Sequence, residues 1–137
     1  MTPWWVNYIG IPYQADRCGR EGCNCWGLVR LVWKEQLHFD VPDFLRVRTS
    51  ADLARLTQAE QWQEVQEPEP FAIALYQFPD GLLHSGIVVD AQTLLHTGQR
   101  SDSKLDPSRK YRPYLQGFYW PKDHLNRSAD GSDYRPS

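Results

Sequence analysis

The sequence has no excess of basic charge, no long apolar run and only three cysteines. Its 137 residues contain 15 Lys and Arg against 17 Asp and Glu, a balance that argues against a surface for nucleic acid. No run reaches the length of about 18 consecutive apolar residues that a membrane span needs, so none is predicted. Three clustered cysteines cannot staple a whole domain, and at most Cys18 and Cys23 pair, which leaves Cys25.

The ends of the chain carry no targeting or repeat signal. The start, MTPWWVNYIGIPY, lacks the basic residues and apolar run of a signal peptide, so we expect synthesis in the cytoplasm without one. The length suits one domain, which we expect over residues 1–125. The polar end NRSADGSDYRPS predicts a disordered tail over residues 126–137.

Helical signals dominate the first half of the chain. Residues 3–9 predict a short helix that begins at Pro3. Asn24 is a good N-cap, and from Cys25 onward the apolar residues recur with the period of a helix that packs one face inward. The segment TSADLARLTQAEQ, residues 49–61, begins with a capping-box pattern and predicts a second helix.

The second half predicts strands. FAIALYQF, residues 71–78, is continuously apolar, as a buried strand would be, and LLHSGIVVD (82–90), TLLHTG (93–98) and GFYWP (117–121) follow. The order of elements predicts an α+β fold, with a helical N-terminal half packed on an antiparallel sheet.

Cys25 is the first candidate for chemistry. A thiol in the first turn of a helix lies beside unpaired backbone N–H groups and the positive end of the helix dipole, which favour the thiolate. A lone cysteine on an apolar helix is more often a small buried residue. A catalytic role for Cys25 therefore requires a base from another part of the chain.

Two of the four histidines fall in neighbouring strands. If residues 90–92 form a three-residue hairpin loop, Gly86 faces His96 and His84 faces Gly98. The histidines are then diagonal neighbours on one face, with Cβ atoms about 7–8 Å apart or less, whereas a two-residue loop would place them on opposite faces. Such a pair can supply a base and the polar group that holds its tautomer.

These residues resemble a known family. GIPYQADRCGREGCNCWGLVRLVW, HSGIVV and LLHTG look like the NlpC-type cell-wall cysteine endopeptidases, which are papain-like. In that family Asp-Cys-Ser-Gly-Leu-Val opens the central helix, a His-x-Gly strand supplies the base and a later polar residue, often His, orients it. The resemblance implies Cys25 as nucleophile, His84 as base and His96 as orienting residue. A family tyrosine thought to help hold the oxyanion implies that role for Tyr13.

The resemblance extends from Gly10 to Gly98 and includes departures. Asn24 stands where the family has Asp, Trp26 stands where it has Ser, and the Gly-Asp pair before the first core strand is missing. A tryptophan after the cysteine and the closing LQGFYWP resemble the variants found in phage tails. The fold implied is the papain-like NlpC-type fold.

The implied activity is that of a cysteine peptidase that hydrolyses amide bonds in peptidoglycan stem peptides through a thioester, with no cofactor and no metal. The implied partners are the stem peptide and phage tail proteins, and the implied place of action is a virion tail at the bacterial cell wall. Three alternatives stay open: a structural tail component with weak activity, a papain-like acyltransferase that uses the same nucleophile and base, and a zinc site. The zinc site would use Cys18, Cys23 and Cys25 with one histidine, although their spacing differs from the usual Cys-x-x-Cys pairs.

Overall fold

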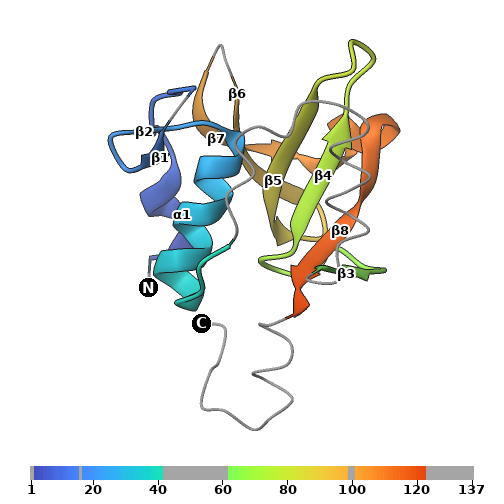
Figure 1. Cartoon of the computed structure of the whole chain (residues 1–137), viewed down its shortest axis with the longest axis horizontal. Coiled ribbons are helices and arrows are strands. Elements are labelled where there is room, and N and C mark those ends of the chain that lie inside the picture. Colours follow the sequence, from blue (N-terminus) through green and yellow to red (C-terminus); the bar gives the residue numbers. More distant parts are fainter. Residues whose placement is uncertain (1, 16, 42–61, 99–100, 123–137) are drawn as a thin grey trace, which may run out of the picture.

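A computed structural model describes residues 2–15, 17–41, 62–98 and 101–122. Within these ranges an α-helix packs beside an antiparallel sheet of six strands in the order β3-β8-β4-β5-β6-β7 (Figure 1). The strands are β3 (Trp62–Val65), β4 (Ile73–Gln77), β5 (Leu83–Asp90), β6 (Thr93–Gly98), β7 (Ser101–Pro107) and β8 (Leu115–Pro121). The helix α1 (Cys25–Leu37) follows a small hairpin of β1 (Cys18–Gly19) and β2 (Gly22–Cys23), and two 3-10 helices are η1 (Trp4–Tyr8) and η2 (Ser108–Tyr114).

The α+β prediction is confirmed for these elements, including the helix that begins at Cys25 and the four expected strands, which are β4, β5, β6 and β8. The short N-terminal helix is present in the 3-10 form. The predicted helix over residues 49–61 and the predicted tail over residues 126–137 lie outside the described residues. In the N-terminal half of the chain, helical structure is therefore established only for η1 and α1.

The two outer strands of the sheet were not predicted from the sequence. β3 and β7 stand at its two edges, and both have polar sequences, WQEV and SDSKLDP. An edge strand is half solvated and needs no continuous apolar run, so its sequence resembles that of a loop. The β1–β2 hairpin is only two residues long on each side, too short for any periodic signal.

Asn24 fixes the start of α1. Its side-chain oxygen accepts a hydrogen bond from the N–H of Gly27 at 2.6 Å, and its amide nitrogen donates to the carbonyl of Ala15 at 2.7 Å. The first bond is an N-cap, and the second ties the helix start to the loop before it. An aspartate could make only the first bond, because a carboxylate cannot donate to Ala15.

Trp26 and Arg20 attach neighbouring segments to the helix. Trp26 is buried and packs edge-on against Trp62 of β3, with ring centroids 5.9 Å apart. The guanidinium of Arg20 binds the carboxylate of Glu35 through two nitrogens, at 2.6 Å and 3.3 Å. The β1–β2 hairpin, which carries Arg20 at its turn, is thereby held against α1 just upstream of Cys25.

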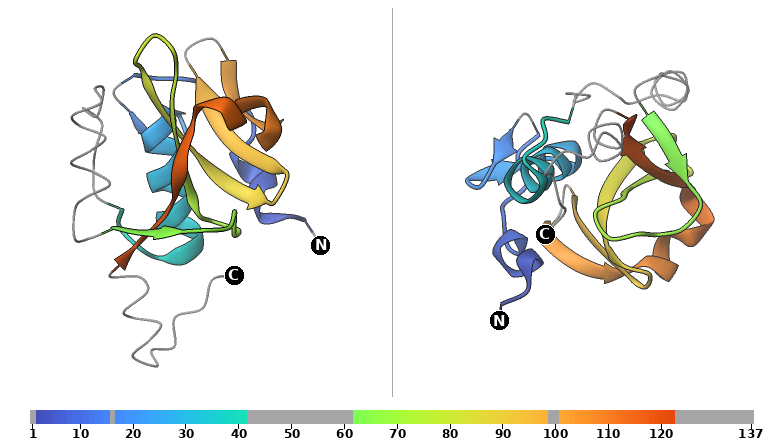
Figure 2. Two further views of the ribbon diagram at one scale, coloured as in Figure 1. Left: turned by 90° about the vertical axis from the view of Figure 1, so that its right-hand side faces the viewer. Right: turned by 90° about the horizontal axis from the view of Figure 1, so that it is seen from below.

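The helix lies on one identifiable face of the curved sheet. In the second view of Figure 2 the strands curve round, and α1 lies on their outer side. Ala74 is the register partner of both Gly86 and Phe118, so these three residues share a face. Alternation along the strands adds His84 and Trp120 to that face. Trp120 contacts the ring of a helix tryptophan at a centroid distance of 5.3 Å, so this is the face that α1 covers.

The opposite face forms the inner core. Ile73, Ile87 and Leu95 are register partners across β4, β5 and β6, and each is completely buried. Gly86 precedes Ile87 in β5 and lies on the face toward the helix, where an added Cβ would come within 2.6 Å of Leu94. None of the helices in the described ranges combines the length and the apolarity that crossing a membrane requires.

We predict that Asn24→Ala lowers the free energy of unfolding by about 1–3 kcal/mol, because it removes the cap and leaves the Ala15 carbonyl without its donor. Asn24→Ser keeps a capping oxygen and loses only the second bond, so its loss should be smaller. Urea denaturation of both variants measures this. Equal unfolding midpoints for the wild type and Asn24→Ala would contradict the proposed role of the cap.

Candidate active site

The two histidines predicted to be neighbours are in direct contact. His84 Nε2 lies 2.7 Å from His96 Nδ1, within hydrogen-bond distance, and the ring centroids are 5.0 Å apart. His96 is buried and His84 is half-buried. The contact follows from the pairing of Ile87 with Leu95, which is the register that the sequence analysis predicted.

The predicted three-residue hairpin loop is wrong. Asp90 is paired with Thr93, so the loop contains only Ala91 and Gln92. The register shifts by one residue between Val88 and Asp90, which marks a bulge in β5. The bulge restores the pairing that a longer loop would have produced, and both histidines keep the same face.

A carboxylate extends the histidine pair on its far side. Asp106 Oδ2 lies 2.7 Å from His96 Nε2 and accepts a hydrogen bond from the Tyr111 hydroxyl at 2.9 Å. The Lys104 amine is 3.8 Å from the same oxygen, with its side chain about half exposed. Asp106 and Tyr111 were not predicted from the sequence, because both lie in segments without apolar periodicity, β7 and η2. An aspartate close before a proline and a tyrosine gives no recognisable signal by itself.

The charge of Asp106 determines where the imidazole protons lie. Burial raises the pKa of Asp106, but hydrogen bonds from His96 and Tyr111 outweigh it, and the net pKa is below the usual value. An ionised carboxylate only accepts, so His96 carries its proton on Nε2. His96 Nδ1 then accepts from His84 Nε2–H, which leaves Nδ1 of His84 as a bare lone pair.

Burial keeps both rings neutral at neutral pH. Burial, followed by the charge of His96, lowers the pKa of His84 from 6.5 to about 3. Burial also lowers the pKa of His96, although the hydrogen bond and charge of Asp106 oppose that effect. The site therefore holds a neutral base, and the carboxylate supports the ring that lies next to it.

Aromatic rings form the walls around the histidines. Phe78 is stacked on His84 with centroids 5.5 Å apart, and Tyr76 is tilted against it at 6.1 Å. Tyr111 packs edge-on against His96 at 5.0 Å. Burial raises the pKa of Tyr76 to about 12, and burial and then Asp106 raise the pKa of Tyr111 to about 12, so both hydroxyls stay protonated.

Cys25 and His84 lie at the starts of α1 and β5, two elements that pack against each other. Trp33 Nε1 donates to the carbonyl of Phe71, and the Phe71 N–H donates to Val88, so the middle of α1 is level with Val88. Cys25 lies eight residues before Trp33, which is about 12 Å along the helix axis. His84 lies four residues before Val88, which is about 13 Å along the strand. α1 and β5 run side by side in Figure 1. Cys25 is a free thiol of intermediate exposure, and in the described ranges no hydrogen bond joins it to His84.

Tyr13 is held beside the segment that leads to Cys25. It forms an isolated parallel bridge with Cys23, bounded by hydrogen bonds from Cys23 N to Pro12 O at 3.0 Å and from Gln14 N to Cys23 O at 3.1 Å. Its side chain is half-buried, and its hydroxyl has no hydrogen-bond partner among the described residues. The hydroxyl is therefore available to a ligand.

Of the three cysteines in the alternative zinc site, the structure describes the side chains of Cys23 and Cys25. Among the residues that the structure describes, no group of three His, Cys, Asp or Glu side chains is arranged to hold a metal ion. The backbones of Cys18 and Cys23 are register partners in the β1–β2 hairpin. The side chain of Cys18 lies outside the described part of the chain, so its predicted pairing with Cys23 stays a prediction.

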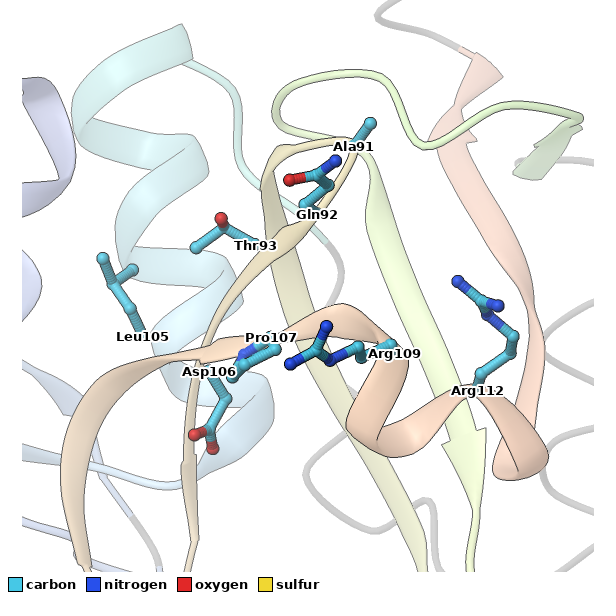
Figure 3. Close-up of a pocket in the computed structure, with 8 residues that line it drawn as sticks. All are labelled: Ala91, Gln92, Thr93, Leu105, Asp106, Pro107, Arg109 and Arg112. Atoms are coloured by element: carbon cyan, nitrogen blue, oxygen red, sulfur yellow. The ribbon is translucent and has the colours of Figure 1, made fainter.

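A cavity of about 550 Å³ opens beside the far end of the histidine pair. Its lining residues are Ala91, Gln92, Thr93, Leu105, Asp106, Pro107, Arg109 and Arg112 (Figure 3). The carboxylate of Asp106 points away from the hairpin tip in this view. Cys25 and His84 do not line this cavity, so it is not the place where they would meet a substrate.

Several solved structures share the fold, and two of them show the extent of the similarity. The NlpC/p60 domain of the peptidoglycan hydrolase SagA is 18% identical, with a TM-score of 0.59 over 82% of this chain and 87% of that domain. A lipoprotein-like protein of the NLP/P60 family from Staphylococcus aureus is also 18% identical, with a TM-score of 0.57 over 83% of this chain and 37% of that longer chain. No protein-family model and no curated protein matches this sequence. The fold is that of NlpC/p60 domains.

We predict that acid destabilises the fold through His84. Between pH 6.5 and about 3 the unfolded chain carries a proton on this histidine that the folded protein excludes, so stability is lost as the pH falls through this window. The slope from one such group is at most about 1.4 kcal/mol per pH unit.

Urea unfolding of the wild type and of His84→Gln at about pH 7, 5.5 and 4.5 measures this slope, because the amide does not titrate. The wild type should lose stability faster than the variant over this range. Parallel lines for the two proteins would show that His84 titrates normally in the folded state.

Proposed function

We propose that the protein is a cysteine peptidase that hydrolyses amide bonds in peptidoglycan stem peptides, with Cys25 as nucleophile and His84 as base. One observation carries this proposal: hydrogen-bond contacts join Asp106 to His96 and His96 to His84 Nε2, on the sheet face covered by the helix that begins at Cys25. From these contacts we infer that Nδ1 of His84 is unprotonated. A neutral imidazole and a helix-start thiol are the two partners that nucleophilic thiol catalysis needs.

The reaction follows from these positions. His84 Nδ1 accepts the Cys25 proton, and the sulfur attacks the carbonyl carbon to give a tetrahedral oxyanion. The Cys25 N–H and the Tyr13 hydroxyl would donate to that oxygen. The C–N bond breaks as His84 returns its proton to the leaving amine, and a thioester remains. Water, deprotonated by His84, attacks the thioester and releases the acid and the free thiol.

His96 would hold the base in position. Its Nδ1 accepts from His84 Nε2–H and so fixes both the rotation of the His84 ring and the nitrogen that is free to act. The Cys-His-His assignment made from the sequence is consistent with this contact. The same arrangement could transfer the acyl group to an amine instead of water, and the products distinguish the two reactions.

The substrate class is proposed from the fold. One of the structural neighbours is a domain of a peptidoglycan hydrolase, and the sequence segments around all four proposed residues resemble cell-wall endopeptidases. A location in a phage tail, with tail proteins as partners, is proposed from the resemblance at Trp26 and in the closing strand alone.

The decisive test is incubation with purified peptidoglycan of known stem composition, followed by mass analysis of the released fragments. The wild type should release fragments with a new free amine and carboxylate at one stem-peptide bond. Cys25→Ala and His84→Ala should release none, because each removes a reacting group. Lys34→Ala, on the exposed side of α1, is a matched control that should retain full activity. Fragments that appear equally with Cys25→Ala would rule out this chemistry, and new amide linkages would identify an acyltransferase.

We predict that Tyr13→Phe lowers the rate constant by about 10²–10³, because it removes one donor to the oxyanion and keeps the ring. Substrate binding should hardly change, since the hydrogen bond forms fully only in the transition state. Steady-state kinetics on a stem-peptide substrate separate kcat from KM, and thermal unfolding checks that the fold is intact. A stable variant with wild-type turnover would assign Tyr13 to the wall of the substrate groove.

A further inference from the structure

Asp106 is a half-buried acidic residue that lies two hydrogen bonds away from the proposed base. Its side chain is 13% exposed, and the oxygen that faces His96 also receives the Tyr111 hydroxyl. Lys104 approaches the same oxygen only at 3.8 Å, with a side chain that is 45% exposed. A partly solvated ion pair of that kind contributes little, so the bond to His96 is the main contact of this carboxylate within the described residues.

We propose that Asp106 is a positioning residue for the proposed reaction: through His96 it selects the tautomer in which His84 presents an unprotonated Nδ1. This inference rests on the proposed function for its consequence, although the tautomer itself does not. Three features of the site support this role: the placement of the protons, the placement of the charge and the position of the carboxylate.

The placement of the protons differs between the two tautomers of His96. Opposite Asp106, His96 must carry hydrogen on Nε2, so its Nδ1 accepts from His84. Without the carboxylate, His96 can equally carry hydrogen on Nδ1 and donate it to His84 Nε2. His84 would then carry its own proton on Nδ1, which is the nitrogen that has to accept from Cys25. The carboxylate thus decides whether the base is available.

The placement of the charge depends on the proton that leaves Cys25. When it arrives at His84 Nδ1, the proton on His84 Nε2 can pass along the 2.7 Å contact to His96 Nδ1. One proton enters His84 and one leaves it, so His84 is neutral again. His96 becomes the cation, and its Nε2–H still donates to Asp106. His96 has a carboxylate at 2.7 Å that stabilises a positive charge on its ring, whereas His84 has no carboxylate partner among the described residues. The reverse transfer returns the proton for the leaving amine.

The position of the carboxylate depends on Tyr111. Its hydroxyl donates to Asp106 at 2.9 Å, and its ring packs against His96. The phenol therefore stabilises the ionised carboxylate and holds it opposite Nε2. Tyr111→Phe should weaken this arrangement without removing it, because the carboxylate and the ring packing remain.

The inference can be tested by two measurements, neither of which needs peptidoglycan. The ¹⁵N shifts of the imidazoles report which nitrogen of each ring is protonated, and the pH dependence of Cys25 alkylation reports the proton affinity of the base that receives its proton. The proteins compared are the wild type, Asp106→Ala, Tyr111→Phe and the matched control Asp102→Ala, which removes an exposed carboxylate from the same strand.

The wild type and Asp102→Ala should show His96 protonated on Nε2 and His84 unprotonated on Nδ1. Asp106→Ala should populate the other tautomer and should slow alkylation at neutral pH by about tenfold or more, which corresponds to at least one pKa unit for the thiol. Tyr111→Phe should lie between them. Unchanged imidazole shifts and an unchanged alkylation rate in folded Asp106→Ala would overturn the inference.

A double-mutant comparison separates positioning from structure. If Asp106 acts through His96, Asp106→Ala should change alkylation by less than about twofold in a His96→Ala background, because the connecting ring is gone. An equal loss in both backgrounds would show that Asp106 only supports the fold and would overturn the proposal. Wild-type tautomers with no peptidoglycan cleavage would refute the proposed function and leave the tautomer assignment standing.

Discussion

The pairing of Ile87 with Leu95 determines which side chains of β5 and β6 share a face, and the candidate site depends on it. A slip of one residue would carry His96 to the inner core and leave His84 without its neighbour. Two local features favour the observed register. The side chain of Asp90 accepts from the Gln92 N–H at 2.8 Å and closes the tight turn, and Gly86 leaves room where a Cβ would meet Leu94 at 2.6 Å. The glycine of the His-x-Gly motif is thus needed for packing between β5 and β6.

Burying two imidazoles among aromatic rings is unfavourable unless their polar atoms are satisfied. Within the site this condition is met in sequence: Asp106 accepts from His96, His96 accepts from His84, and Tyr111 donates to the carboxylate. Of the four imidazole nitrogens, only Nδ1 of His84 has no hydrogen-bond partner among the described residues. The pair therefore has one imidazole nitrogen for the next hydrogen bond, and that nitrogen belongs to a residue on the face covered by the helix of the candidate nucleophile.

The parts of the site that could be predicted from the sequence are those encoded by local patterns. The helix start at Cys25 follows from an N-cap and an apolar period, and the histidine contact follows from alternation within two apolar strands. The loop length was predicted incorrectly because a bulge at Val89 has no sequence signal, yet its effect on register equals that of the expected longer loop. Asp106 and Tyr111 could not be predicted, because their positions depend on the register of a polar edge strand and on the fold of η2.

The departures from the family motif also have physical explanations. Trp26, where the family has Ser, packs on Trp62 and so anchors the edge strand β3 to the helix. Asn24, where the family has Asp, makes a second hydrogen bond, to Ala15, that a carboxylate could not make. An aspartate would also place a negative charge next to Cys25 and disfavour its thiolate. The amide caps the helix without that charge, so the N-cap residue does not oppose the positive end of the helix dipole at the proposed nucleophile.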